Sequence, residues 1–206
     1  MKRICVFSLL VLVLSLSVVG CSKATGIKED NMPANGIIRI SPSSLFEGDA
    51  KKLEPHLGLL SGCVKVKYSG PKKYINTAYE IWEDGKMKKS SAPLSTSIEK
   101  NYDGEVSVSL KNESTDDIKQ VYRLTVAANS ASSSGIVPEI VFPDGGRSPR
   151  NIDKVIEISD DKEIAVWGYV VQKDMVILNE ESIEESAKKA SWAFVFKISM
   201  SDKVLK

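Results

Sequence analysis

Apolar and polar residues alternate along much of the chain beyond residue 36. In "VKVKY", at 64–68, two valines and a tyrosine alternate with two lysines. The runs "EVSVSL" at 105–110 and "WAFVFKISM" at 192–200 follow the same pattern. Because successive side chains of a strand point to opposite faces of a sheet, each run predicts a strand with one face toward a core.

Six further apolar runs predict strands. They are residues 37–40, 74–82, 120–128, 136–142, 153–158 and 163–171. The last run is apolar on both faces, which predicts a central strand covered on both sides. Asp-Gly pairs in "EDGK" and "NYDGEV" predict tight turns, and a short strand follows the first turn at 86–91. These strands, with no helices between most of them, indicate an all-β fold, an antiparallel two-sheet sandwich.

Two segments depart from the strand pattern. In "NEESIEESAKKA", at 179–190, Asn179 can cap a helix whose apolar stripe is Ile183, Ala187 and Ala190. This predicts one short helix near 180–190, joining the last two long strands. In residues 41–57, Gly48 and Pro55 limit any helix to a turn or two.

An immunoglobulin-like variant of the sandwich is one form that this pattern allows. Trp82 would then take the place of the central core tryptophan of that fold. The second cysteine that immunoglobulin domains often carry is missing, but sandwiches in general do not need it.

The first twenty-one residues follow a different pattern. Lys2 and Arg3 precede sixteen uncharged residues, Ile4 through Val19. A helix of that length spans only about 24 Å, less than the roughly 30 Å of a membrane's hydrocarbon core. The length and the charge order predict a cleaved secretory signal.

The end of this run carries a recognisable motif, Val18, Val19, Gly20 and Cys21. It resembles the lipobox of bacterial lipoprotein signals, with valine where leucine is usual. The resemblance implies that the Cys21 thiol receives a diacylglyceryl group and that cleavage leaves Cys21 at the mature N-terminus. Two acyl chains anchor a protein stably, whereas one holds it only marginally. The alternatives are an ordinary signal peptide, or an uncleaved anchor in which Cys21 is incidental.

The resemblance sets the expected location and organisation of the chain. Residues 1–20 would be the signal peptide and residues 21–35, which are mostly polar, a lipidated flexible tether. Residues 36–206 would form a single β-sandwich domain. That domain would be anchored at the outer face of a bacterial cell membrane, on the periplasmic side if the cell has an outer membrane.

The charge of the chain bears on its expected partners, and its cysteine content on the role of Cys63. The chain has 28 basic and 27 acidic residues, and cleavage would remove Lys2 and Arg3, leaving a net charge of about −1. With no basic excess to bind a phosphate backbone, nucleic acid is not an expected partner. Cys63 would be the one cysteine left besides Cys21, and it is interpreted as a packed strand residue.

Catalytic and metal-binding patterns are missing from the sequence. The only histidine is His56, which leaves no histidine-based metal site and no usual Ser-His-acid triad. The pairs Asp116–Asp117 and Asp160–Asp161 lack calcium-loop spacing and are interpreted as solvated turns. We therefore expect no cofactor, no metal and no catalysis.

Two features are candidates for recognition. The predicted loop "FPDGGRSPRN", at 142–151, carries Arg147 and Arg150, whose guanidinium groups suit a carboxylate or phosphate. A solvated connection is the alternative. Trp167 and Tyr169 share one face of a strand and could stack on sugars, although core packing is favoured.

The sequence thus predicts a lipid-anchored extracytoplasmic binding or accessory module for an envelope protein, peptide or glycan. One alternative is a carboxylate-dependent envelope hydrolase, which would need a pocket with two carboxylates about 5–10 Å apart. The other is a structural subunit of an envelope complex, which predicts an exposed apolar patch, such as Trp167 and Tyr169 uncovered.

Overall fold

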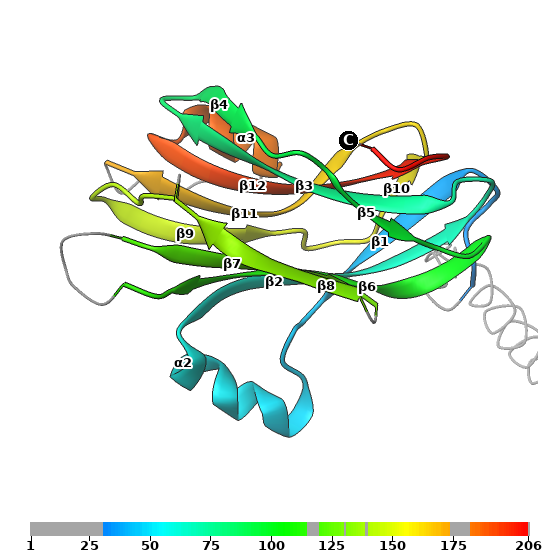
Figure 1. Ribbon diagram of the computed structural model, residues 1–206, viewed down its shortest axis with the longest axis horizontal. Helices are drawn as coiled ribbons and strands as arrows, with labels where there is room; N and C mark the ends of the chain where they lie inside the picture. Colours follow the sequence, from blue (N-terminus) through cyan, green and yellow to red (C-terminus); the bar gives the residue numbers. More distant parts are fainter. Residues whose placement is uncertain (1–30, 115–119, 130, 139, 174–181, 206) are drawn as a thin grey trace, which may run out of the picture. The chain divides into compact units, whose positions relative to one another are not determined.

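Two antiparallel sheets, each of six strands, pack face to face in the structure (Figure 1). The computed structural model describes residues 31–114, 120–129, 131–138, 140–173 and 182–205. Sheet A has the order β10-β1-β2-β6-β7-β8, and sheet B the order β4-β3-β12-β11-β9, with β5 also paired to β3. This confirms the predicted all-β, two-sheet sandwich, and Met32–Lys206 form one compact unit.

The strands of sheet A are β1 Ile37–Ser43, β2 Leu59–Ser69, β6 Asn101–Asn112, β7 Tyr122–Ala128, β8 Ala131–Val137 and β10 Ile156–Ser159. Those of sheet B are β3 Tyr74–Glu83, β4 Lys86–Ser90, β5 Leu94–Ser97, β9 Gly146–Asn151, β11 Ile164–Gln172 and β12 Trp192–Ser201. All nine long runs predicted from the sequence overlap strands. The run at 136–142 is misplaced, because β8 begins at Ala131 and ends at Val137.

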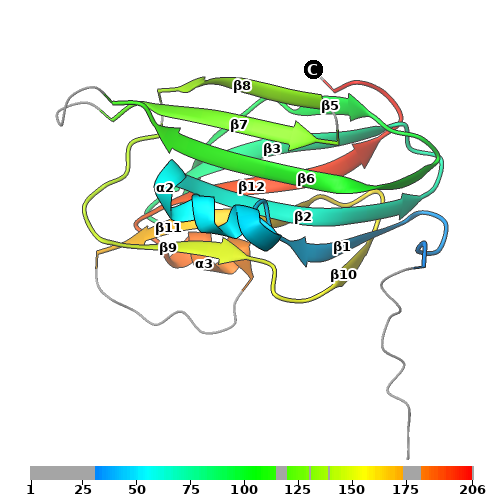
Figure 2. The ribbon, with the colours of Figure 1, turned by 90° about the horizontal axis from the view of Figure 1, so that it is seen from below.

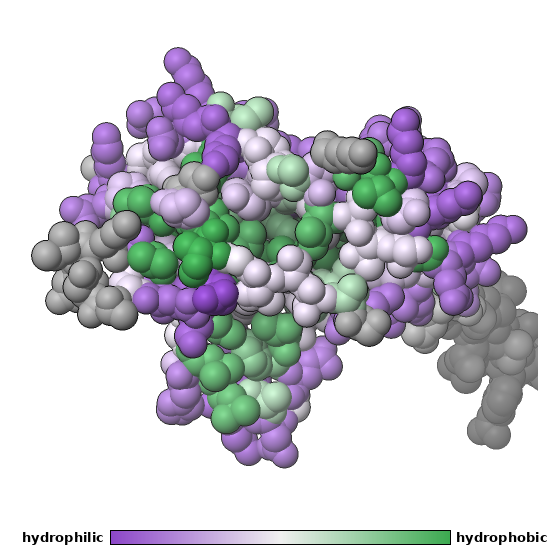
Figure 3. All heavy atoms as spheres, viewed as in Figure 1, coloured by the Kyte–Doolittle hydropathy of each residue, from purple (hydrophilic) through white to green (hydrophobic). Residues whose placement is uncertain are grey.

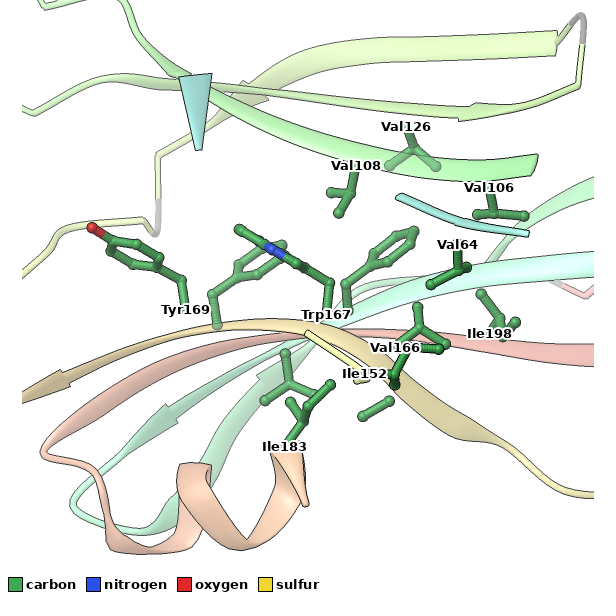
Figure 4. Packing of buried hydrophobic residues seen from close by; sticks show 14 of the residues in the cluster. Val64, Val106, Val108, Val126, Ile152, Val166, Trp167, Tyr169, Ile183 and Ile198 are labelled. Atoms are coloured by element: carbon green, nitrogen blue, oxygen red, sulfur yellow. The ribbon is translucent and has the colours of Figure 1, made fainter. Parts of the chain in front are cut away.

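Alternation along the strands builds the core between the sheets. In β2 the valines at 64 and 66 and Tyr68 are buried, whereas Lys65 between them is exposed. In β12 the aromatic residues Phe194 and Phe196 are buried. Figure 4 shows how Val64, Val106, Val108 and Val126 of sheet A meet Trp167 and Ile198 of sheet B across the gap between the sheets.

Strand β11 is buried on both faces, as predicted for 163–171. Every residue from Ala165 to Val171 is buried. Sheet A covers one face, and helix α3, Ile183–Lys189, packs on β11 and β12 from the other side. Figure 4 shows Ile183 and Trp167 on opposite sides of β11. Gly168 allows this close packing, since a Cβ there would lie 2.7 Å from Cγ2 of Ile183.

Helix α3 confirms the predicted helix near 180–190, but its N-terminal cap differs from the expectation. Ser182 is the capping residue, and its Oγ accepts a hydrogen bond from the Glu185 backbone N–H at 3.2 Å. Asn179, the predicted cap, lies outside the described residues. Ile183, Ala187 and Ala190 are buried, as the predicted apolar stripe requires.

The central tryptophan of the core is Trp167, which is only 1% exposed. Its indole ring occupies the space beside Gly62 of β2, where any Cβ would overlap the ring. Trp82 is half-buried, and its Nε1 donates to Oε2 of Glu80 at 2.8 Å. Trp82 is therefore not the central tryptophan that was expected: it is a partly buried residue that packs against the core and shares a face of β3 with Glu80.

The strand order also differs from that of an immunoglobulin domain. In immunoglobulin constant domains one sheet has the strand order A-B-E-D and the other C-F-G. In the first sheet strand B is followed by E and then by D, although D comes before E in the chain. Here β2 is followed across sheet A by β6, β7 and β8 in consecutive order. The fold is thus a two-sheet sandwich with a meander at one end of sheet A.

The connection between β1 and β2 forms a helical projection from the outer face of sheet A (Figures 1 and 2). It contains a 3-10 turn, η1, Gly48–Leu53, and helix α2, Glu54–Leu57, neither of which has a buried residue. Gly58 ends α2 with a φ of 60°, which glycine adopts without steric cost. The short extent agrees with the limit expected from the glycine and proline of this segment.

Candidate binding cleft

The two arginines predicted as a recognition pair lie in a strand, not in a loop. Residues Gly146–Asn151 form β9, an edge strand of sheet B, in which Arg147 pairs with Val171 and Arg150 with Gly168. Arg147 and Arg150 are three residues apart, so their side chains leave opposite faces of the strand. The guanidinium of Arg147 lies 5.5 Å from the centre of the Phe142 ring. The two arginines therefore do not form one anion-binding fork.

The aromatic pair predicted from β11 belongs to the core. Trp167 is 1% exposed and Tyr169 is 8% exposed, and their ring centres lie 6.4 Å apart. Phe142 contacts Tyr169 from the adjoining loop, with ring centres 5.2 Å apart. Core packing, the favoured interpretation of this pair, is confirmed. Neither ring is available to stack on a sugar or to form an exposed patch.

The remaining polar candidates have structural surroundings. Asp160 accepts a hydrogen bond from the Tyr68 hydroxyl at 2.7 Å, and it lies in the turn that joins β10 to β11. Burial and a nearby Glu105 carboxylate raise the pKa of the half-buried Cys63 thiol, which disfavours the reactive thiolate. His56 is exposed on α2. No group of three or more metal-ligating side chains occurs within the part of the chain that the structure describes, and Asp116–Asp117 lie outside it.

An ionic cluster on the outer face of sheet B is also structural. The Lys197 ammonium lies 2.7 Å from Glu80 and 3.2 Å from Glu163. Burial alone would lower the pKa of Lys197, but its contacts with the two carboxylates outweigh burial and raise it. Both carboxylates are therefore held by one cation, and Glu80 also accepts the indole N–H of Trp82.

The feature best suited to bind a ligand is a cleft between the sheets, beside edge strand β8. It has a volume of about 160 Å³. Strands β3, β5 and β12 of sheet B supply one wall, and β7 and β8 of sheet A supply the other. Apolar side chains dominate the lining: Tyr79, Leu94, Leu124, Val126, Val137 and Phe196. Figure 3 shows apolar surface in the hollow between the two layers.

The cleft exists because three of the four inward residues of β8, Ala131, Ser133 and Gly135, are small. Residues directly opposite one another in an antiparallel pair share a face of the sheet. The register pairs Leu124 with Gly135 and Val126 with Ser133. Strand β8 thus presents glycine and serine where larger apolar residues would close the sandwich. A Cβ placed on Gly135 would have no heavy atom within 4 Å, so the space beside it is open.

The polar groups around the cleft are largely engaged in hydrogen bonds. Ser91 Oγ accepts from the Tyr79 backbone N–H at 3.0 Å, and Thr77 Oγ1 donates to the Leu94 carbonyl at 3.5 Å. Among the described residues that line the cleft, none is charged. An uncharged, apolar surface with few free polar groups favours an apolar group over an anion, a cation or a sugar.

These lining residues are not evident from the sequence, because their role depends on pairing. Residues 131–135, "ASSSG", have no large apolar side chain, and the strand predicted from the sequence begins only at 136. The contribution of this segment to the cleft is evident only from the register, which places Gly135 opposite Leu124. In a strand over 131–137, alternation places Ala131, Ser133 and Gly135 on the same face. This row of small residues is the signal that could have revealed the cleft.

The described part of the chain contains no helix with the length and apolar character needed to cross a membrane. Comparison with known proteins gives no match, whether to a protein-family model, to a curated protein or to a solved structure.

Proposed function

We propose that the chain is a lipid-anchored extracytoplasmic binding module that holds an uncharged apolar group of its ligand in the cleft beside β8. The observation that supports this proposal is the open, uncharged space between Gly135 and the apolar walls. An engineered cavity of about 150 Å³ binds benzene, so a cleft of about 160 Å³ has room for one aromatic ring or one branched aliphatic group.

The cleft alone would give selectivity and only modest affinity. Burying an apolar side chain of this size contributes about 1.5–3 kcal/mol. That free energy corresponds to roughly ten- to hundredfold in affinity. Anchoring through Cys21 would add to this by raising the local concentration of the module near ligands of the cell envelope. The module would therefore select among molecules already held at the membrane.

Filling the cleft tests this proposal. Benzene, titrated into isotope-labelled residues 22–206, is expected to shift the NMR signals of the methyl groups of Leu124 and Val126. In Gly135→Leu the new side chain occupies the cleft, and the shifts should disappear. Gly146→Leu is the matched control, because Gly146 lies in the edge strand β9 and a Cβ there meets nothing closer than 3.9 Å. Benzene shifts that persist in Gly135→Leu would contradict the proposal.

The anchor is tested separately. Cys21→Ser should either release the protein from membranes or leave the precursor uncleaved, because serine lacks the thiol that carries the lipid. Mass spectrometry of the mature wild-type protein should find acylated Cys21 at its N-terminus. A mature N-terminus elsewhere, without lipid, would remove the proposed location but leave the cleft experiment unaffected.

A structural role in an envelope complex is the second candidate. It predicts an exposed apolar patch, and the β1–β2 connection carries three exposed leucines, Leu45 at 41%, Leu53 at 56% and Leu57 at 44%. Figure 3 shows apolar surface on this projection. If this role is correct, replacing the three leucines with serine should reduce the size of the native assembly extracted from membranes. The hydrolase alternative gains no such support, since the cleft has no carboxylate among its described lining residues.

A further inference from the structure

Strand β8, next to the cleft, differs from the other outer strands of the two sheets. Natural sheets protect their edges with charged residues, prolines, bulges or very short strands. Strand β9 carries a proline and two arginines, β4 carries three lysines beside a bulge, and β10 and β5 have only four residues each. Strand β8 has seven residues with no charge and no proline, and six of the seven are exposed. It is the unprotected edge.

The backbone of β8 has unused hydrogen-bonding capacity. Alternate residues of an antiparallel edge strand direct their N–H and C=O groups away from the neighbouring strand. Strand β8 ends the order of sheet A and pairs only with β7 within the described chain. An extended peptide can add to such an edge, gaining affinity from main-chain bonds and selectivity from pockets for alternate side chains.

We propose that the apolar group held in the cleft is a side chain of an extended, uncharged peptide segment that pairs with β8 as an added strand. This inference rests on the proposed function of the cleft. The absence of charge on the described lining and along β8 matches an uncharged segment. The segment would bring the backbone to the free edge and one large apolar side chain to the opening beside Gly135.

A second copy of this chain fits the cleft less well than such a peptide. The inward residues of β8 opposite β7 are Ala131, Ser133, Gly135 and Val137, and only Val137, which is already buried, is large. If two β8 strands paired with each other, the largest inward side chain that the second copy could present to the space of about 160 Å³ is a valine, and its other inward residues are alanine, serine and glycine. Inward side chains of an added strand repeat about every 6.6 Å. Because a cleft of about 160 Å³ holds one group, it favours a peptide with one large residue at the position facing the opening and small residues two positions before and after it.

The test uses the full chain in lipid nanodiscs and a capped heptapeptide, Thr-Ser-Thr-Leu-Thr-Ser-Thr. We expect hydrogen exchange of the outward-facing β8 amides to slow when the peptide binds. Replacing the central leucine of the peptide with alanine should weaken binding about tenfold, because less apolar surface is buried. In Gly135→Leu the leucine peptide should lose this advantage, so that both peptides bind equally.

A series of N-methylated peptides identifies the strand pairing itself. Each member lacks one backbone N–H and keeps every side chain. We expect methylation at alternate positions to weaken binding about tenfold and methylation at the intervening positions to change it less than twofold. This alternation is a signature of an added strand, which binding through the leucine side chain alone would not produce.

The outcomes separate this inference from the function on which it depends. If benzene binds but the peptide leaves β8 exchange unchanged, or N-methylation has no alternating effect, strand addition is wrong and the cleft function stands. Protection of β8 in a dimer without peptide would overturn the inference in favour of a second copy. If neither benzene nor the peptide binds, the proposed function fails as well.

Discussion

Two glycines on the inner face of sheet A have opposite consequences. The space left by Gly62 of β2 is taken up by the Trp167 indole of the facing sheet, which a Cβ would overlap. The space left by Gly135 of β8 stays open, since no described heavy atom lies within 4 Å of the position that a Cβ would take there. The absence of a side chain thus makes room for the Trp167 ring at Gly62, whereas at Gly135 it leaves an open space.

This difference shows that the size of a residue has meaning only with its partner across the core. Interiors are close-packed, and a small residue on one layer must be matched by a large one on the other. Trp167 supplies the match for Gly62, and its ring also contacts Phe194, with ring centres 5.8 Å apart. Near β8 no described residue reaches across in this way, so the space beside Gly135 stays open.

The largest expected effect comes from removing the side chain that fills the closed region. Trp167→Ala should lower the free energy of unfolding by about 3–5 kcal/mol, measured by urea denaturation, because it leaves a large cavity. Trp167→Phe should cost less, since it keeps a ring and removes an indole N–H that has no partner among the described residues. A loss below about 1 kcal/mol for Trp167→Ala would show that this region is not tightly packed.

Adding a methyl group to the closed region should have the next largest effect. Gly62→Ala places a Cβ against the indole ring and should lower the free energy of unfolding by about 1–3 kcal/mol. The double variant Gly62→Ala, Trp167→Phe should recover part of this loss, because the smaller ring leaves room. Urea denaturation of all three variants measures the coupling, and strictly additive losses would argue against a direct contact.

The same change in the open region should have a smaller effect of opposite sign. Gly135→Ala should raise the free energy of unfolding by about 0.4–1 kcal/mol, because alanine restricts the unfolded chain and meets no obstacle in the folded one. Gly146→Ala in β9 provides a comparison at another strand edge. Destabilisation by Gly135→Ala of the size expected for Gly62→Ala would mean that the cleft is closed in solution.

An effect confined to high pH reports on Tyr68, another buried residue of β2. Burial and the hydrogen bond to Asp160 raise the pKa of Tyr68 from 10.0 to about 12. The folded state therefore binds this proton more tightly, and the contribution of Tyr68 to stability is complete below pH 10 and lost as the pH rises toward 12. We expect the free energy of unfolding to fall across this range.

Tyr68→Phe is the control for this alkaline loss. The fall should be smaller in the variant, although not absent, because burial also raises the pKa of Tyr102 to about 12. The measurement is urea denaturation at several values of pH, with phenolate formation followed by ultraviolet absorbance. An identical fall in the wild type and in Tyr68→Phe would contradict the assignment to Tyr68.

Much of the fold could be predicted because strand periodicity is local. The alternation in 64–68 and 192–200 and the doubly apolar run at 163–171 each reflect one strand and its faces. Strands β5 and β9 escaped prediction because their residues are mostly polar, and they are strands only through pairing with β3 and β11. The sequence could not show whether Trp82 or Trp167 is the central tryptophan of the core, since local sequence does not reveal which of them has a glycine opposite it.

The candidate site was less predictable than the fold. Arginines at 147 and 150 attract notice by their chemistry, but a strand separates them onto opposite faces. The cleft depends on Ser133 and Gly135, which are important because they lack the side-chain volume that would fill the space between the sheets. Sites of this kind arise from register between strands, which a single sequence specifies only through the complete fold.

The most direct test of the central claim is crystallography of the protein under xenon pressure. Xenon binds dry, apolar cavities of about 150 Å³. We predict a xenon atom between the sheets, in contact with Tyr79, Leu124 and Phe196, in the wild type and in Gly146→Leu but not in Gly135→Leu. A wild-type cleft that binds no xenon because its own side chains fill the space would contradict the account.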